Sequence, residues 1–244
     1  MFDRIAGRYD LLNRVMTMGI DRRWRRAAVR ATEIGPGREA LDVCCGTGDL
    51  TFLLARTGAA RVTGIDFSAN MLHQARLRVA KEDASVTARV EFIEGDALNL
   101  PFEDASFDAV TVGFGVRNVE DLQRAFEEFN RVVRPGGKVV CLEITRPRRA
   151  LARIFYELWF DRIVPLVGGL LSGDREAYRY LPESTRDFPA PDALAQLLRD
   201  VGLESVEYRL FAGGIVALHT GCVADDATVA TSTTQQTESA AGRR

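Results

Sequence analysis

The sequence predicts an α/β protein built around a mainly parallel sheet, and three observations support this. From about residue 39 onward, short apolar runs alternate with amphipathic segments, which is the pattern of successive βαβ units. One of these apolar runs leads directly into a glycine-rich turn, as a strand does where it feeds a helix. The chain has 244 residues, of which 46% are hydrophobic and 27% charged, and is therefore long enough for one domain with a sizeable core.

The elements are assigned in chain order. The first 38 residues are expected to be helical, with a turn at 18–19 and an end at the breaker Gly35-Pro36-Gly37. Ser68 is a suitable N-cap for the second helix of the domain that follows. The expected helices are 49–57, 69–81 and 120–133, and the expected strands are 39–45, 61–66, 90–95, 107–112, 137–144, 204–211 and 214–220. The last two strands join through a short glycine turn and are therefore antiparallel.

Three parts follow from this assignment: a helical cap over 1–38, a domain over 39–221 and a tail over 222–244. The tail is rich in Ala, Thr, Ser and Gln and is expected to be disordered. Residues 146–190 interrupt the alternation and are expected to form a helical lid within the domain. Its stretch 151–171 is apolar but too charged to cross a bilayer. The apolar stripe of this stretch either packs in the core or lines a tunnel for an apolar substrate.

The charge of the chain argues against nucleic acid as a partner. The formal net charge is −2, so nothing draws the whole molecule to a polyanion. A local basic cluster stands apart, formed by Arg22, Arg23, Arg25 and Arg26. It is either a solvated helix face or a basic edge that meets a membrane surface or an anionic substrate.

The four cysteines do not have the spacing of metal ligands, so no metal site is expected. They are interpreted as reduced thiols in a cytoplasmic protein, because the N-terminus lacks the pattern of a signal peptide. Peripheral contact with the inner face of a membrane is left open, as is a homodimer.

The most informative segment is Leu41–Thr51, a strand that runs into a turn and then a helix. Gly46 and Gly48 allow the backbone to approach a ligand closely. Asp66 ends the next strand, 20 residues after Gly46, where an acid accepts hydrogen bonds from both ribose hydroxyls of an adenosine. Asp96 ends the third strand, where a carboxylate can bind the adenine amino group. These loops converge on one crevice of a doubly wound sheet, which predicts an adenosine site.

This arrangement resembles the class I S-adenosylmethionine-dependent methyltransferases. Their first motif reads apolar-Asp-apolar-x-x-Gly-x-Gly and is matched here by Leu41, Asp42, Val43, Gly46 and Gly48. The resemblance implies a Rossmann-like, seven-stranded, mostly parallel sheet with an antiparallel last strand. It also implies S-adenosyl-L-methionine as the cofactor.

Four further blocks, at 2–13, 113–118, 178–184 and 213–219, are similar to those of the ubiquinone/menaquinone biosynthesis C-methyltransferases and fall in the same order. That family implies C-methylation of a prenylated quinol, demethylmenaquinol to menaquinol in menaquinone biosynthesis, or of a ubiquinol precursor. The cofactor-binding positions carried over from the two resemblances are Asp42, Gly46, Thr47, Gly48, Asp66, Asp96, Ala97 and Gly113. Gly113 stands where a serine is common, and Asp96 where an asparagine is.

Three residues are candidates for the chemistry itself. Arg117 is expected beside the reacting methyl, where a guanidinium stabilises a developing oxyanion and polarises a water that takes the quinol proton. Asn118 is expected to orient that water or the quinol oxygen, unless it caps the helix that follows. Tyr9 is expected to close over the site. His219 is the other base to consider, although a lone histidine at a strand end is more often structural.

Other readings remain open. A methyltransferase of the same fold could act on a sterol or another lipophilic phenol without needing the Arg117-Asn118 block. A nicotinamide-dependent oxidoreductase is disfavoured because Thr51 replaces the third glycine of its fingerprint. A module that binds adenosine compounds without catalysis is the third alternative.

Overall fold

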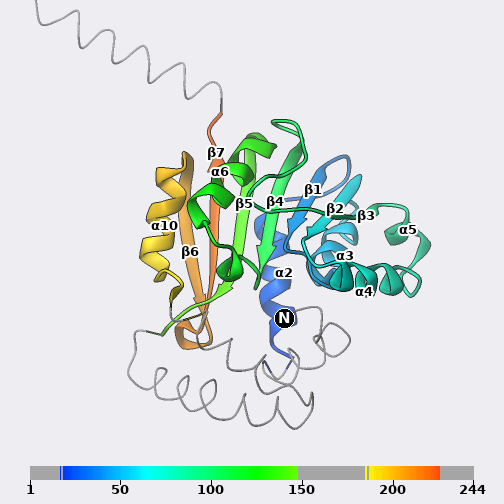
Figure 1. Ribbon diagram of the computed structural model, residues 1–244, viewed down its shortest axis with the longest axis horizontal. Helices are drawn as coiled ribbons and strands as arrows, with labels where there is room; N and C mark the ends of the chain where they lie inside the picture. The colour runs from blue at the N-terminus through cyan, green and yellow to red at the C-terminus, as the bar shows by residue number, and fades with distance from the viewer. Residues whose placement is uncertain (1–16, 18, 148–184, 186, 226–244) are drawn as a thin grey trace, which may run out of the picture.

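The computed structural model describes residues 17, 19–147, 185 and 187–225, and its centre is a seven-stranded sheet flanked by helices (Figure 1). The strands are β1 (Glu39–Val43), β2 (Arg61–Asp66), β3 (Val90–Glu94), β4 (Phe107–Gly113), β5 (Val133–Ile144), β6 (Leu203–Phe211) and β7 (Val216–Val223). The helices are α2 (Asp21–Ala31), α3 (Asp49–Ala55), α4 (Ala69–Val79), α5 (Ala84–Thr87), α6 (Leu122–Val132) and α10 (Pro191–Asp200), with short 3₁₀ turns η1 (Val116–Asn118) and η3 (Ala212–Gly214).

The sheet has the strand order β3-β2-β1-β4-β5-β7-β6. All neighbours from β3 to β5 are parallel, while β7 is antiparallel to both β5 and β6. The predicted sheet, with its antiparallel last strand, is therefore confirmed. The order reverses between β1 and β4, and at such a switch point the loops beyond the strands diverge and leave a crevice for a ligand.

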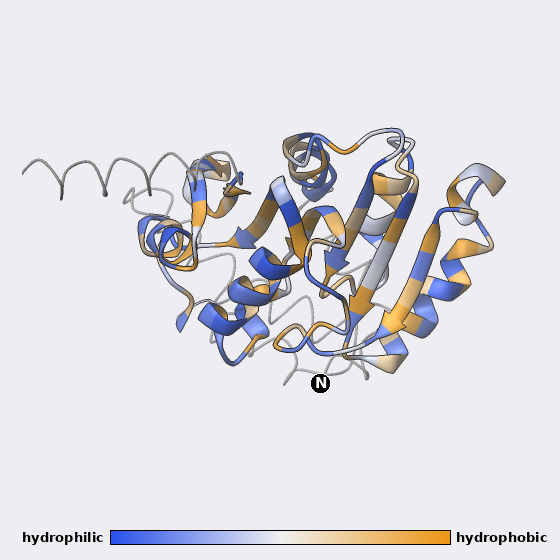
Figure 2. Ribbon diagram, turned by 90° about the horizontal axis from the view of Figure 1, so that it is seen from above, coloured by the Kyte–Doolittle hydropathy of each residue, from blue (hydrophilic) through white to orange (hydrophobic). Residues whose placement is uncertain are grey.

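Strand side chains alternate between two cores, one on each face of the sheet. In β1, Ala40 packs with the core under α2, α3 and α4, while Leu41 and Val43 pack with the core under α6 and α10. The strands accordingly carry long orange stretches in Figure 2, whereas the helices alternate orange and blue. Both faces are covered, which is why the central strands are apolar on both sides.

The C-terminal half of the domain differs from the prediction in two places. Helix α10 was not assigned from the sequence, although it begins with Pro191 directly after its N-cap, a favoured first helical position. Strand β5 begins at Val133, not at 137, because the stretch around Pro135 forms a register shift opposite β4 and the strand continues through it. The proline therefore does not end the ladder. The short helix α5 was not predicted either, while the remaining strands and longer helices lie where they were predicted, to within a few residues at their ends.

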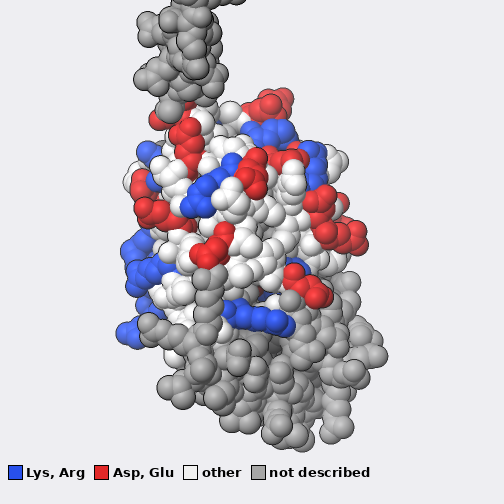
Figure 3. All heavy atoms as spheres, turned by 90° about the vertical axis from the view of Figure 1, so that its left-hand side faces the viewer, with Lys and Arg blue, Asp and Glu red and all other residues white. Residues whose placement is uncertain are grey.

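Several expectations fall on residues outside those described. These are Tyr9 and most of the cap over 1–38, nearly all of the lid over 146–190, and the tail beyond Asp225. Across the described part of the chain, no helix combines the length and the apolar character that a membrane span requires. The face seen in Figure 3 mixes basic and acidic side chains among uncharged ones, in keeping with the small net charge.

The register shift between the parallel strands β4 and β5 generates a stability prediction at Gly137. A Cβ there would lie 2.6 Å from the carbonyl oxygen of Asp108 and 2.8 Å from that of Arg134, and neither backbone atom can move freely. Gly137→Ala is expected to lower the free energy of unfolding by about 1–3 kcal/mol in chemical denaturation. Gly35→Ala is the control, because open space surrounds Gly35, and it should change stability by less than about 0.5 kcal/mol. Equal effects of the two changes would contradict this account.

Candidate functional site

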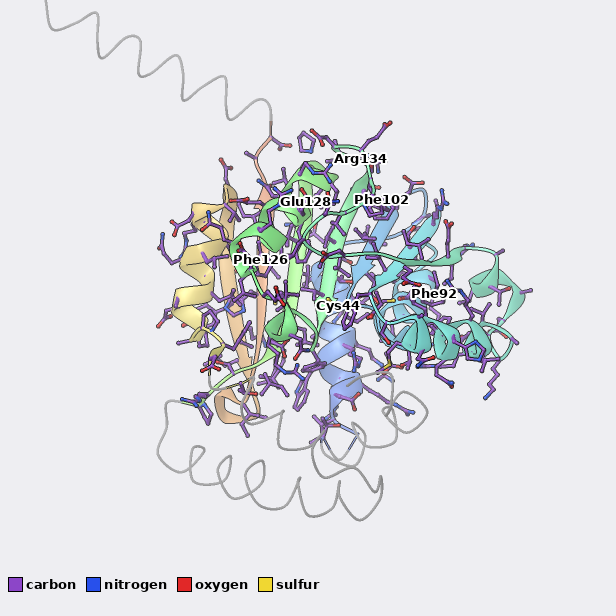
Figure 4. The ribbon with its side chains drawn as sticks, viewed as in Figure 1. Cys44, Phe92, Phe102, Phe126, Glu128 and Arg134 are labelled. Atoms are coloured by element: carbon purple, nitrogen blue, oxygen red, sulfur yellow. The ribbon has the colours of Figure 1, made fainter. Side chains whose placement is uncertain are left out.

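A cavity of about 460 Å³ opens at the carboxyl ends of β1, β2, β3 and β4, at the switch point of the sheet. Cys44, which follows β1, lies near the centre of the molecule in Figure 4. The lining residues come from the four strand ends and from α2: Arg25, Val43, Cys44, Cys45, Gly46, Thr47, Asp49, Ile65, Asp66, Phe67, Met71, Gly95, Asp96, Ala97, Leu98, Gly113, Phe114, Gly115, Asn118, Val119 and Glu120.

The loop after β1 is shaped by residues with left-handed backbone. Gly46 has φ 55° and Gly48 has φ 88°, a region that glycine enters without strain. A Cβ on Gly48 would lie 2.8 Å from the ring of Phe92 and 2.9 Å from that of Phe52. Gly48 therefore lets the turn pack closely on these two rings and does not line the cavity. Gly46 and Thr47 do line it.

Asp66 joins two of the cavity loops. Its Oδ2 accepts a hydrogen bond from the backbone N–H of Gly46 at 2.8 Å, and its Oδ1 accepts one from the N–H of Ser68 at 2.9 Å. Ser68 in turn caps α4, as predicted, by accepting from the N–H of Met71. The carboxylate is thus held at the cavity wall, and a carboxylate is a group that accepts hydrogen bonds from hydroxyl groups.

Asp42 lies beneath the cavity and does not line it. Its carboxylate accepts hydrogen bonds from the hydroxyl groups of Thr51 in α3, at 2.7 Å, and of Thr111 in β4, at 2.9 Å. Burial raises the pKa of Asp42 from 3.8 to about 6, and the two threonines offset part of that effect. Toward a ligand Asp42 therefore acts indirectly, by tying β1 to the helix that carries the loop.

The third strand supplies Asp96 and Ala97 to the cavity. Asp96 is exposed and accepts a hydrogen bond from the backbone N–H of Leu98 at 2.9 Å, which orients its side chain. From the fourth strand, Gly113 contributes backbone alone: a Cβ there would lie 2.5 Å from Leu50. The structure therefore brings together Gly46, Thr47, Asp66, Asp96, Ala97 and Gly113 in one cavity.

Of the residues predicted to take part in the chemistry, Asn118 and Arg117 lie within the described part of the chain, and only Asn118 lines the cavity. Asn118 lines the cavity, and its amide Nδ2 donates to the carbonyl of Gly115 at 3.1 Å. Arg117 lies behind the cavity wall, with its Nη1 2.7 Å from Glu143 and 2.6 Å from the carbonyl oxygen of Phe114. Asn118 does not cap the next helix, because the side chain of Asp121 does so instead.

Sequence reasoning grouped Arg25 with a surface cluster and missed its place in the cavity. Arg22, Arg23 and Arg26 are exposed, but Arg25 is 7% exposed and lines the cavity. The signal was present: Arg25 follows Trp24 on the buried stripe of α2 and stands four residues after Asp21, with which it forms an ion pair.

His219 and the cysteines have structural places. His219 is buried, and its Nε2 lies 2.9 Å from the carbonyl oxygen of Pro191, away from the cavity. Cys44 and Cys45 line the cavity, and burial raises the pKa of both thiols, so they stay protonated and act as small packing residues. No group of described residues has the composition of a metal site.

The strand order and the glycine-rich loop with acids beyond the next two strands define the class I S-adenosylmethionine-dependent methyltransferase fold. The chain belongs to the ubiE/COQ5 methyltransferase family, whose sequence profile it matches over residues 1–223.

Relatives support the family over nearly the whole chain. It is 47% identical over 224 residues to the demethylmenaquinone methyltransferase of Roseiflexus castenholzii, covering 91% of each chain. It is also 47% identical over 223 residues to the enzyme of that name from Thermus thermophilus, covering 91% of this chain and 99% of the relative.

Solved structures with the same fold are more distant. A S-adenosylmethionine-dependent methyltransferase of Thermotoga maritima superposes with a TM-score of 0.61 at 20% identity, covering 91% of this chain and 97% of that one. The [4+2]-cyclase SpnF superposes with a TM-score of 0.67 at 19% identity, covering 92% and 94%. At these identities the likeness concerns the fold alone.

The raised pKa of Asp42 generates a pH prediction. The folded state holds this proton more tightly than the unfolded state, so the contribution of Asp42 to stability falls as the pH rises from about 4 to about 6. Asp42→Asn removes this titration. The free energy of unfolding of the variant, measured by urea denaturation and compared with that of the wild type at each pH, should therefore rise by on the order of 3 kcal/mol from pH 4 to pH 7. Parallel pH profiles of the two proteins would refute the assignment.

Proposed function

We propose that this protein transfers the methyl group of S-adenosyl-L-methionine to a ring carbon of a prenylated quinol, converting demethylmenaquinol to menaquinol in menaquinone biosynthesis. The observation that carries the proposal is a single cavity with two kinds of wall. Asp66 and Asp96 form one end, and the other end presents the Asn118 side chain beside Gly113. The names of the relatives at 41–47% identity support the choice of acceptor.

The residues present fit the cofactor. Asp66 is held by two backbone N–H groups and suits a pair of ribose hydroxyls, while Asp96 suits an exocyclic amino group. Gly46 and Gly113 both line the cavity with backbone alone, and a Cβ on Gly46 would meet no atom within 4 Å. When bound, the cofactor supplies an electrophilic methyl on a positively charged sulfur.

Asn118 is proposed to contact the acceptor. Its Nδ2 is committed to the carbonyl of Gly115, which fixes the direction of the amide. Its Oδ1 is buried and has no hydrogen-bond donor among the described residues. A buried acceptor of this kind gains most from an incoming hydroxyl group, because leaving it unpaired costs about 1–3 kcal/mol. Holding the quinol hydroxyl there orients the ring, and loss of its proton pushes charge toward the ring carbon to be methylated.

Arg117 is proposed as the residue that positions Asn118. Its guanidinium forms a buried ion pair with Glu143, whose side chain is 1% exposed, and binds the turn at Phe114. Glu143 also accepts from the backbone N–H of Arg117, so the segment that carries Asn118 is anchored to β5. The direct role in stabilising an oxyanion and polarising a water remains a proposal for Arg117, and closure over the site remains one for Tyr9.

The protein is proposed to be located in the cytoplasm, at the inner face of the membrane in which quinols dissolve. Arg22, Arg23 and Arg26 are exposed on one helix and would favour an anionic lipid surface. This basic edge fits a peripheral contact.

The direct test uses the purified full chain with methyl-labelled S-adenosylmethionine. Demethylmenaquinol, a ubiquinol precursor and a lipophilic phenol are offered as acceptors in parallel. Label is expected in the demethylmenaquinol product. Label only in another acceptor would replace the substrate, and label in none would refute the proposed function.

Asp66→Ala is expected to weaken binding of S-adenosylmethionine by at least about 100-fold, because it removes two hydrogen bonds to a charged acceptor and loosens the Gly46 loop. Calorimetric titration measures this. Glu94→Ala is the matched control, since Glu94 is an exposed acid at the end of the neighbouring strand that does not line the cavity. Unchanged affinity in Asp66→Ala would contradict the adenosine assignment.

Asn118→Ala is expected to lower kcat at least about tenfold while leaving the affinity for S-adenosylmethionine within about threefold. Steady-state assays with the quinol and cofactor titration separate the two effects. Asn130→Ala is the control, because Asn130 also donates its Nδ2 to a backbone carbonyl and has a buried Oδ1 without a partner, but lies outside the cavity. If both variants turn over equally, Asn118 has no special role.

A further inference from the structure

We propose that Arg25 binds the carboxylate of the methionine part of the cofactor. The inference rests on the proposed function, and it names a residue that the adenosine loops do not include. Arg25 belongs to α2, on the chain before the sheet begins, yet it reaches the cavity beside the end of β4. A Cβ placed on Gly113 would lie 3.7 Å from its Nη1.

The guanidinium of Arg25 is held at its Nε, while its Nη1 lies beside Gly113 at the cavity. Its Nε lies 3.4 Å from Asp21 and 3.5 Å from Asp49, and its Cζ lies 5.0 Å from the centre of the Phe114 ring. Within the described residues, no hydrogen bond involves its Nη1 or Nη2. Two guanidinium nitrogens with fixed orientation match the two oxygens of a carboxylate.

The order of the strands gives the direction of the ligand. The adenosine acids Asp96 and Asp66 end β3 and β2, which lie on one side of β1. A ligand that continues along the same edge passes the loop after β1 and reaches the end of β4, where Arg25 lies. Of the described residues that line the cavity, Arg25 alone is a lysine or arginine, and the acids there would repel a carboxylate placed elsewhere.

A second arginine braces this arrangement. Asp49, which pairs with Arg25, also binds Nη2 of Arg78 at 2.7 Å. Arg78 donates from Nη1 to the carbonyl oxygen of Thr47 at 3.0 Å and to its hydroxyl group at 2.9 Å. The guanidinium of Arg25 is thereby linked to the loop that faces the ligand. Side chains fixed before binding lose little freedom when the ligand arrives.

The test compares two ligands that differ in the methionine part. S-adenosylhomocysteine carries the carboxylate, and 5′-methylthioadenosine lacks the whole amino-acid group. Arg25→Gln is expected to weaken the binding of S-adenosylhomocysteine by about 10–150-fold in calorimetric titration. It is expected to weaken the binding of 5′-methylthioadenosine by less than about threefold. Arg25→Lys should lose less affinity for S-adenosylhomocysteine than Arg25→Gln does, because lysine keeps the positive charge. Arg26→Gln, an exposed neighbour on the same helix, should change neither affinity.

The outcomes separate this inference from the proposed function. If the wild type binds neither ligand, the proposed function fails and this inference with it. If the wild type binds both and Arg25→Gln weakens them equally or not at all, only the role of Arg25 is overturned. A measurement on the wild type alone guards against misfolding of the variant: binding of decarboxylated S-adenosylmethionine as tight as that of the intact compound would also overturn it.

Discussion

The buried carboxylate of Asp42 is the constraint on which the rest of the site depends. It sits under the switch point of the sheet and receives hydroxyl hydrogen bonds from Thr51 in α3 and from Thr111 in β4. These bonds hold together the two strands whose loops diverge to form the cavity, and they set the start of the helix behind the glycine loop. The raised pKa of Asp42 reflects the free-energy cost of burying the charged carboxylate that makes these bonds.

Above this tie, charged side chains fix the loops from behind the cavity. Arg25, Asp49 and Arg78 link α2, the start of α3 and the end of α4, while Arg117 and Glu143 anchor the turn after β4. Ion pairs that are buried, as Arg117–Glu143 is, or partly buried, as Arg78–Asp49 is, contribute little net stability, because the ions lose hydration. Their effect here is geometric, since they determine where Thr47 and Asn118 stand.

The fold by itself does not determine the reaction. The [4+2]-cyclase SpnF has the same fold at 19% identity, and its name describes a different reaction. We propose that the end of the cavity lined by Asn118 and Gly113 is where members of this fold differ in their acceptor. The family, shown over residues 1–223, narrows the activity to methyl transfer.

The sequence by itself determined the sheet, its antiparallel last strand and the loops that meet at the cavity. Strand periodicity, the pair Gly46 and Gly48, and the acids Asp66 and Asp96 are local signals, because each depends on residues within one βα unit. Only the tertiary structure decided which arginine lines the cavity. Arg25 pairs with Asp21 on its own helix but also turns inward toward Asp49 in α3, and Arg117 turns away from the cavity toward Glu143 in β5. Such pairings depend on distances in space, which spacing along the sequence does not record.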